Sequence, residues 1–419
     1  MSAKEPRRVV VTGMGLITAV GNNVPGNWQA LLAGTSGGAI ITAFDPSALA
    51  VRFAAEVKEF NPADYLDRKE VKRTDRFTHF ALVATAEAMR NAGYDGRGPD
   101  VPPDRFGVIT GSGIGGITTL EEQHRVYLER GPDRVSPFFV PMFIADMAPG
   151  LISMKYGAKG PNYTTVSACA SSAHAVGNSF RLVRDGLVDV MITGGSESSV
   201  TPLTMAGFAS MKALSFRNDS PEAASRPFDA NRDGFVLGEG CGILVLEEME
   251  FAKTRGASIL GEIVGYGISA DAHHMTAPAP EGEGAQRAMR LALEDAGVRP
   301  EEVDYINAHG TSTPLNDLSE TQAIKKVFGD HAYKLTVSST KSMTGHTLGA
   351  AGGVESVICV LAAREGKIPP TINFSERDPD CDLDYAHNRV VERPVRLALS
   401  NSFGFGGHNV CLAIKRWEG

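Results

Sequence analysis

Two strand–helix units recur in the same order in the two halves of the chain. The segment 87–110 contains the end of a helix, a glycine and a buried strand that runs into a glycine turn, and the segment 291–310 repeats this order. The segment 166–186 joins the end of a strand to a helix of small residues, and the segment 337–366 repeats that unit. The recurrence indicates an internal duplication. Strands that alternate with helices predict parallel sheets with right-handed crossovers.

The boundary between the repeats falls near residue 256. A helix ends at Gly256, and the strand–helix pattern begins again from Ile259. We therefore predict two α/β halves, residues 1–255 and 256–419. Packed together, they would place strand ends from both halves at one central site.

Composition and charge favour a globular cytoplasmic protein. Hydrophobic residues make up 42% and charged residues 21% of the 419 residues, as in ordinary globular chains. The net charge of −8 argues against a chain built mainly to bind nucleic acid. None of the five cysteines forms a CxxC pair, which fits a reduced compartment. The apolar run near the start is too short for a signal sequence, and no run reaches membrane-spanning length, so we expect no membrane partner.

Cys169 lies where a strand turns into a helix. Thr164 to Val166 resemble a strand end, and the small residues that follow begin an apolar helix that stops at Gly186. Free backbone N–H groups and the positive end of the helix dipole favour a thiolate there, which makes Cys169 a candidate nucleophile. The alternative is a small buried side chain, the usual fate of a free cysteine.

The second half supplies two histidines in similar positions. His309 and His346 each lie in a turn rich in glycine and threonine that follows a strand, and Lys341 lies five residues before His346. Two such histidines beside a cysteine favour nucleophilic catalysis. Zinc is the competing use of this residue set, but the ligands lack a tight local pair, so we predict no metal site. The glycine-rich loop 401–409 could present backbone N–H groups to an oxyanion.

The spacing Gly111-x-Gly113-x-x-Gly116 matches a dinucleotide fingerprint that follows a strand. No strand ends in an acidic residue about twenty positions further on, as ribose binding would need. We interpret the glycines as a turn that lines a pocket. An NAD-dependent oxidoreductase and a non-catalytic scaffold remain the alternatives from other functional classes.

Four motifs in this order carry a specific resemblance: VSACASS, NAHGTSTP, SSTKSMTGH and NSFGFGGHN. With them the chain, from Arg8 to about Arg416, resembles the condensing enzymes, specifically the β-ketoacyl-[acyl-carrier-protein] synthase II family. The resemblance implies a thiolase-like α/β fold with duplicated βαβαβαββ halves in five α-β-α-β-α layers, and a homodimer. It also implies decarboxylative Claisen condensation of an acyl chain with malonyl-acyl-carrier protein, without a cofactor. A dedicated ketosynthase of a polyketide or polyene pathway is the alternative within this class.

The resemblance also assigns roles to individual residues. Cys169 is the acyl-accepting nucleophile, His309 and His346 are the catalytic pair, and Glu320 matches the acidic partner of Lys341. The backbone N–H groups of Cys169 and Phe405 would form the oxyanion hole, which suits the charge that develops on a carbonyl under attack.

Further residues are expected to contact the substrate. Ile114 and Phe403 would line the acyl pocket, and Thr311 and Thr313 would hold the pantetheine arm. An acidic carrier protein needs a local basic surface on this acidic enzyme, for which the candidates are Lys69, Lys72, Arg73 and Lys212. Two departures from the family pattern, Asn316 and His408, bear on fine specificity rather than on reaction type.

Overall fold

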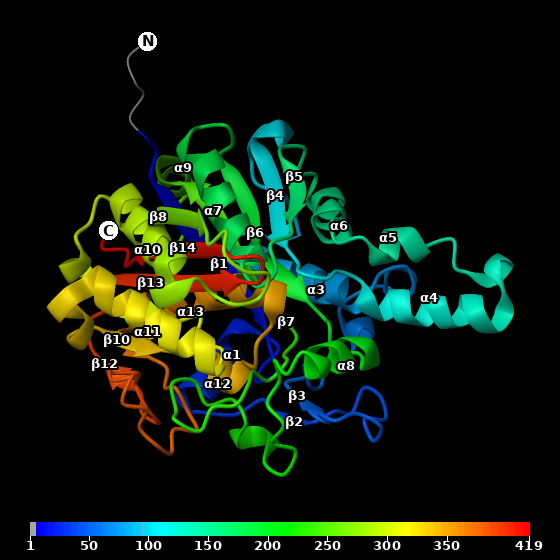
Figure 1. Ribbon diagram of the computed structural model, residues 1–419. Helices are drawn as coiled ribbons and strands as arrows, with labels where there is room; N and C mark the ends of the chain where they lie inside the picture. The colour runs from blue at the N-terminus through cyan, green and yellow to red at the C-terminus, as the bar shows by residue number, and fades with distance from the viewer. Residues whose placement is uncertain (1–5, 95) are drawn as a thin grey trace.

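A computed structural model describes residues 6–94 and 96–419 (Figure 1). Its main sheet has ten strands within this described part, in the order β10-β9-β13-β14-β8-β1-β7-β6-β4-β5. In chain order these strands are β1 (Val9–Ile17), β4 (Phe106–Gly111), β5 (Asn162–Thr165), β6 (Val190–Glu197), β7 (Gly240–Glu248), β8 (Gly261–Ala270), β9 (Tyr305–Asn307), β10 (Thr336–Ser338), β13 (Leu397–Gly404) and β14 (His408–Lys415). Two short pairs join β2 (Ala39–Ile40) to β3 (Phe53–Ala54), and β11 (Lys367–Ile368) to β12 (Val391–Glu392).

The duplication predicted from the sequence is confirmed by the strand order. The first half contributes β5-β4-β6-β7-β1, the second contributes β10-β9-β13-β14-β8, and β1 pairs with β8 where the halves meet. The prediction of parallel sheets is correct for β5, β4 and β6 and for β10, β9 and β13. It is wrong for β7 and β14, which are antiparallel to their neighbours. In the second half, β14 is antiparallel to β13 because a short turn joins them, and consecutive strands joined by such a turn run in opposite directions.

The two halves of the main sheet form two layers, and helices between and outside them complete the five layers. In the middle layer, α7 (Ser171–Arg184) and α13 (Ala351–Glu365) contact strands of both halves. The outer layers contain α3 (Arg76–Asn91) and α6 (Met147–Tyr156) against the first half, and α10 (Glu283–Ala296) with α11 (Pro314–Phe328) beside the second. Every residue of α13 from Ala351 to Ala363 is buried, as expected of a helix that is apolar on all sides.

The remaining helices lie around this framework. They are α1 (Val24–Leu32), α2 (Arg68–Val71), α4 (Ile117–Arg130), α5 (Phe139–Phe143), α8 (Pro202–Ser210), α9 (Met249–Thr254) and α12 (Lys341–Thr344). The segment 137–148 contains α5 and the start of α6. Figure 1 shows α4 and α5 extending together away from the layered body. None of the described helices combines the length and apolar character needed to cross a bilayer.

Glycine permits the two central helices to touch. A Cβ atom added at Gly352 of α13 would lie 2.6 Å from both the backbone nitrogen and the Cβ of Ala173 in α7. The backbone nitrogen of Gly353 also donates to Ser172 Oγ across the same contact, at 2.8 Å. These helices belong to different halves, so the contact fixes the position of one half relative to the other.

We expect Gly352→Ala to destabilise the protein. The added methyl group would overpack a backbone contact at a cost of about 1–3 kcal/mol, which outweighs the gain of about 1 kcal/mol in helix propensity. Gly207 of α8 is the matched control, because a Cβ there has no neighbour within 4 Å. Thermal unfolding should show a lower midpoint for Gly352→Ala and an equal or higher midpoint for Gly207→Ala. Equal shifts in the two variants would contradict the packing argument.

Candidate active site

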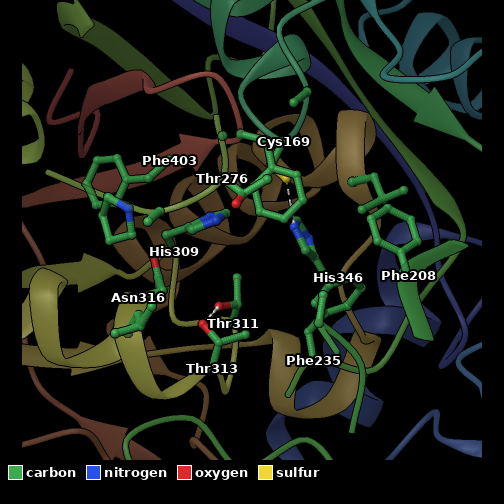
Figure 2. A pocket seen from close by; sticks show the side chains of 18 of the residues that line it. Cys169, Phe208, Phe235, Thr276, His309, Thr311, Thr313, Asn316, His346 and Phe403 are labelled. Carbon is green, nitrogen blue, oxygen red and sulfur yellow. Dashed lines mark hydrogen bonds between the residues drawn. The ribbon is translucent and has the colours of Figure 1, made fainter. Parts of the chain in front are cut away.

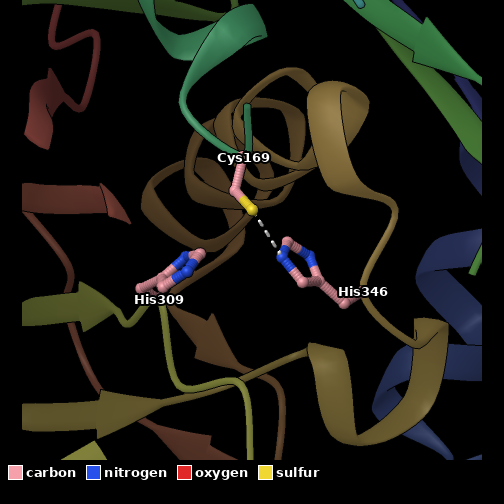
Figure 3. A group of neighbouring side chains, drawn as sticks. All are labelled: Cys169, His309 and His346. Atoms are coloured by element: carbon pink, nitrogen blue, oxygen red, sulfur yellow. Dashed lines mark hydrogen bonds between the residues drawn. The ribbon is translucent and has the colours of Figure 1, made fainter. Parts of the chain in front are cut away.

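The three reactive side chains come from corresponding places in the two halves. Cys169 lies between β5 and α7, and His346 lies between β10 and α13, just after α12. His309 follows β9, the strand that pairs with β10. Figure 3 shows the three side chains converging on one point. The strand-end positions predicted from the sequence therefore meet at one site.

The geometry at this point suits proton transfer. Cys169 Sγ lies 3.0 Å from His346 Nε2, and the two imidazole rings lie 5.3 Å apart at an angle of 84°. All three residues are buried. In both histidines Nδ1 is buried without a hydrogen-bond partner, which leaves Nε2 as the nitrogen available to a substrate.

The turn after β13 lies directly on the cysteine. A Cβ at Gly404, the last residue of β13, would lie 2.9 Å from the carbonyl oxygen of Ser167 and 3.1 Å from the backbone nitrogen of Cys169, so glycine permits this close approach. The N–H groups of Phe405 and of Cys169 itself both interact with the cysteine sulfur and lower its pKa. Two backbone donors therefore converge beside Sγ, from the two residues to which the family resemblance assigned the oxyanion hole.

The expectation of a resting thiolate is wrong. Burial raises the pKa of Cys169 to about 12, and the opposing effects of Lys341 and of the backbone N–H groups are smaller. The pKa values of His309 and His346 both fall well below the usual range, because burial and the nearby Lys341 disfavour an imidazolium. At neutral pH the site therefore holds a thiol that donates to a neutral imidazole.

The predicted partner of Lys341 is also wrong. Lys341 Nζ forms a buried ion pair with Glu355 of α13, a residue that the sequence analysis missed. Glu320 instead accepts hydrogen bonds from the backbone nitrogens of His309 and Gly310, at 2.9 and 2.8 Å. It therefore holds the histidine turn rather than the lysine. The available signal was an acidic residue within the buried, largely apolar part of this helix, where a charged group requires a partner.

A cavity of about 470 Å³ opens onto the three side chains (Figure 2). Its walls include most of the predicted substrate contacts: Ile114, Thr311, Thr313, Phe403, Phe405 and Lys212. Asn316 also lines it, whereas His408 does not. Phe208 and Phe235, which motif reasoning did not identify, form an aromatic wall, and the ring of Phe235 lies 5.4 Å from that of His346. The cavity combines an apolar wall with polar groups near the thiol.

Three predicted carrier contacts lie outside this cavity. Lys69, Lys72 and Arg73 are exposed on or next to α2. The guanidinium of Arg73 lies 4.6 Å from the ring centre of Phe138, just before α5. Of the four predicted carrier contacts, Lys212 is the one that lines the cavity.

Cys169, His309 and His346 also form a group whose potential metal-binding atoms all lie within 4.8 Å of one another. Tetrahedral zinc would separate a sulfur and a nitrogen ligand by about 3.6 Å, given the usual bond lengths. The observed Sγ–Nε2 distance of 3.0 Å is instead that of a hydrogen bond. The arrangement therefore fits a thiol–imidazole pair better than a zinc site.

Two family models together match most of the chain. One, described as the N-terminal domain of β-ketoacyl synthase, matches residues 6–252, and the C-terminal domain model matches residues 260–375. The chain therefore belongs to the β-ketoacyl synthase family, and it is a condensing acyltransferase with a thiolase-like fold.

Individual relatives agree over the full length. The chain is 55% identical to 3-oxoacyl-[acyl-carrier-protein] synthase 2 of Synechocystis sp., with all of both chains covered. It is 52% identical to the protein of the same name from Staphylococcus aureus strain N315, over 98% of this chain and 99% of that one. Among solved structures, the ishigamide ketosynthase/chain length factor matches with 38% identity and a TM-score of 0.91, over 98% of this chain and 100% of that one.

Another solved structure contains a carrier protein. It is a type II polyketide acyl-carrier protein in complex with its ketosynthase, which is bound to a hexaketide. The match has 35% identity and a TM-score of 0.90, and it covers 99% of this chain and all of that chain.

The raised pKa of Cys169 predicts a steep pH dependence of its alkylation by iodoacetamide. Only the thiolate reacts, and below a pKa of about 12 its fraction rises with every increment of pH. The rate should therefore increase about tenfold per pH unit through the neutral and mildly alkaline range. Peptide mass spectrometry would follow Cys169, with Cys169→Ala as the control for the other four cysteines. A plateau near neutral pH would contradict the buried-thiol assignment.

Proposed function

We propose that the protein condenses an acyl chain held on Cys169 with malonyl-acyl-carrier protein during fatty acid chain elongation, giving 3-oxoacyl-acyl-carrier protein, CO₂ and free carrier protein. The single observation that carries this function is the buried thiol 3.0 Å from His346 Nε2, with His309 beside it in an apolar cavity. The names of the full-length relatives support the pathway.

The first half-reaction loads the acyl chain. His346 Nε2 accepts the Cys169 proton as sulfur attacks the thioester carbonyl, and it then gives this proton to the departing pantetheine sulfur. The backbone N–H groups of Cys169 and Phe405 stabilise the tetrahedral oxyanion. Burial disfavours a free thiolate at Cys169, whereas the acyl thioester is neutral and carries no charge that would have to be desolvated.

The second half-reaction forms the new carbon–carbon bond. When malonyl thioester loses CO₂, the electron pair of the broken bond becomes an enolate. Once Cys169 is acylated it no longer donates to His346 Nε2, and His346 takes up the tautomer that carries its proton on Nε2 through exchange with solvent. Both histidines then donate to the enolate oxygen from Nε2–H, and their lowered pKa values keep them neutral. The enolate carbon attacks the acyl carbonyl, Cys169 leaves as a thiolate, and a proton from solvent restores the thiol.

Lys341 and Glu320 act on the catalytic residues rather than on the reacting atoms. Lys341 lowers the pKa of both histidines and of the cysteine, so its charge keeps the imidazoles neutral. Glu320 positions His309 through the backbone. Within the cavity, Ile114 and Phe403 would contact the acyl chain, and Thr311 and Thr313 would hold the pantetheine arm. The hydroxyl oxygens of Thr311 and Thr313 lie 3.0 Å apart, close enough to bind one polar group together.

A polyketide ketosynthase is the second candidate. Two of the solved structures that the chain resembles are ketosynthases described with a type II polyketide carrier or a chain length factor. Mass spectrometry of products from malonyl-carrier protein and a ladder of acyl primers would separate the two. Single-round elongation of saturated primers supports fatty acid synthesis, whereas repeated unreduced condensation supports the alternative.

We also propose that the protein forms a homodimer. Strand β5 is an edge of the main sheet, and Tyr163 on it is exposed. Exposed apolar side chains also lie on the arm formed by α4 and α5, among them Leu128 and Val140. A second copy of the chain could extend the sheet at β5 and cover these side chains.

We also place the boundary between the two halves at residue 255, so that residues 1–255 carry the cysteine and residues 256–419 carry the histidine pair. The matched ranges of the two family models, 6–252 and 260–375, support this division.

We also propose that the protein is located in the cytoplasm, because all five cysteines are free and buried.

Substitution of Cys169 tests the central role. Cys169→Ala should abolish condensation, because this variant has no other side chain that could hold the acyl group at the histidine pair. Cys169→Gln should retain malonyl decarboxylation, because its amide can mimic the acyl thioester. The assay measures 3-oxoacyl product and CO₂ release in parallel. Condensation by either variant would overturn the assignment.

The basic residues on α2 that we propose to dock the carrier protein predict a charge-dependent effect on KM. Reversing Lys69 and Lys72 to glutamate should raise KM for carrier-bound substrates while leaving small thioesters unaffected, and added salt should reduce the difference between this variant and the wild type. Lys253→Glu on α9 is the matched control, since its side chain is 43% exposed and does not line the cavity. Equal effects on carrier-bound and small substrates would reject the docking surface.

A further inference from the structure

Glu197 is a buried carboxylate that takes no part in the steps above. It is the last residue of β6 and has no exposed surface. Its Oε2 accepts hydrogen bonds from the backbone nitrogens of Gly113 and Gly349, at 2.6 and 3.0 Å. Its Oε1 accepts from Ser112 Oγ at 3.1 Å and from the backbone nitrogen of Ile114 at 3.2 Å. One side chain thus joins a turn of the first half to a turn of the second.

The two turns are packed too tightly for other residues. A Cβ at Gly349 would lie 2.1 Å from the nitrogen of Gly113 and 2.6 Å from Glu197 Oε2. A Cβ at Gly113 would lie 2.9 Å from the same oxygen. Both glycines therefore let the carboxylate reach both turns, and Gly113 of the spacing that resembled a dinucleotide fingerprint has this structural use.

Each turn presents an apolar side chain to the cavity next to the linked glycine. Ile114 follows Gly113, Leu348 precedes Gly349, and both line the cavity and pack in the cluster that includes Cys169. Leu348 has a positive φ of 45°, which is unfavourable for a residue with a branched side chain. The hydrogen bond from Gly349 to Glu197 supports that conformation. Ile114 and Leu348 therefore form one wall of the cavity, and Glu197 holds the two turns that carry it.

We propose that Glu197 is a positioning residue that sets the acyl-chain-length preference by holding this wall in place. The inference rests on the proposed function, because it requires that the cavity receives the acyl chain. A carboxylate accepts from donors on both of its oxygens, whereas an amide has only one acceptor oxygen. In Glu197→Gln one oxygen is replaced by an N–H₂ group, which opposes the backbone N–H groups that this oxygen accepted from and releases the part of the wall that they hold.

The test measures kcat/KM for a ladder of saturated acyl primers. In Glu197→Gln the ratio of long-primer to short-primer kcat/KM should rise by about 10-fold or more, the size of effect typical of a changed apolar pocket. Ser112→Ala removes one of the four hydrogen bonds and should shift the ratio in the same direction by less. Combined with Ile114→Ala, which already removes the bulk of the wall, Glu197→Gln should have a smaller effect, because the two residues act on the same wall.

Glu239→Gln is the matched control. Glu239 is also buried and accepts from Arg76, from the nitrogen of Val57 and from Ser198 Oγ, but it does not line the cavity or touch the two turns. It should lower the melting temperature and leave the primer ratio within about twofold of the wild type.

An unchanged ratio in folded Glu197→Gln, or the same change in Glu239→Gln, would overturn the inference. If Glu197→Gln does not fold, an unchanged ratio in Ser112→Ala overturns it instead. Failure of the proposed function is distinct, because the wild-type protein would then form no condensation product with any primer.

Discussion

The contact between α7 and α13 is the constraint on which the site depends. Gly352 lets the two helices approach until the backbone of one meets Ala173 of the other. Cys169 lies just before α7 and His346 just before α13, so this approach brings the thiol of one half to 3.0 Å from the imidazole of the other. A wider spacing between α7 and α13 would leave both halves of the main sheet intact and still separate the reacting groups.

Burial then determines the chemistry. Desolvation favours the neutral forms of Cys169, His309 and His346, and Lys341 reinforces this for the histidines. A neutral donor can stabilise an enolate without protonating it fully, and a buried sulfur is more stable as a thioester than as a thiolate. Removing water from the site thus supports both half-reactions. The cost is a buried ion pair between Lys341 and Glu355, which must remain intact.

Repeated strand–helix units and glycine turns in the sequence predicted the duplication and the meeting of the cysteine with two histidines. The five layers followed only from the resemblance of four motifs to the condensing enzymes. The sequence did not predict that Lys341 pairs with Glu355 rather than Glu320, since both glutamates lie on helices and only tertiary packing decides between them. The resting thiol was missed for a similar reason. The dipole argument uses local sequence, whereas the burial that raises the Cys169 pKa arises only when segments far apart in the sequence pack around the cysteine.

The most direct test separates the two half-reactions in His309→Ala. Intact-protein mass would report acylation of Cys169, and CO₂ release from malonyl-carrier protein would report decarboxylation. His309 contributes to the enolate step but does not contact the thiol proton, so acylation should stay near the wild-type rate. Decarboxylation should fall about 10²–10³-fold, as for the loss of one oxyanion donor. Normal decarboxylation in a folded His309→Ala protein would contradict the account.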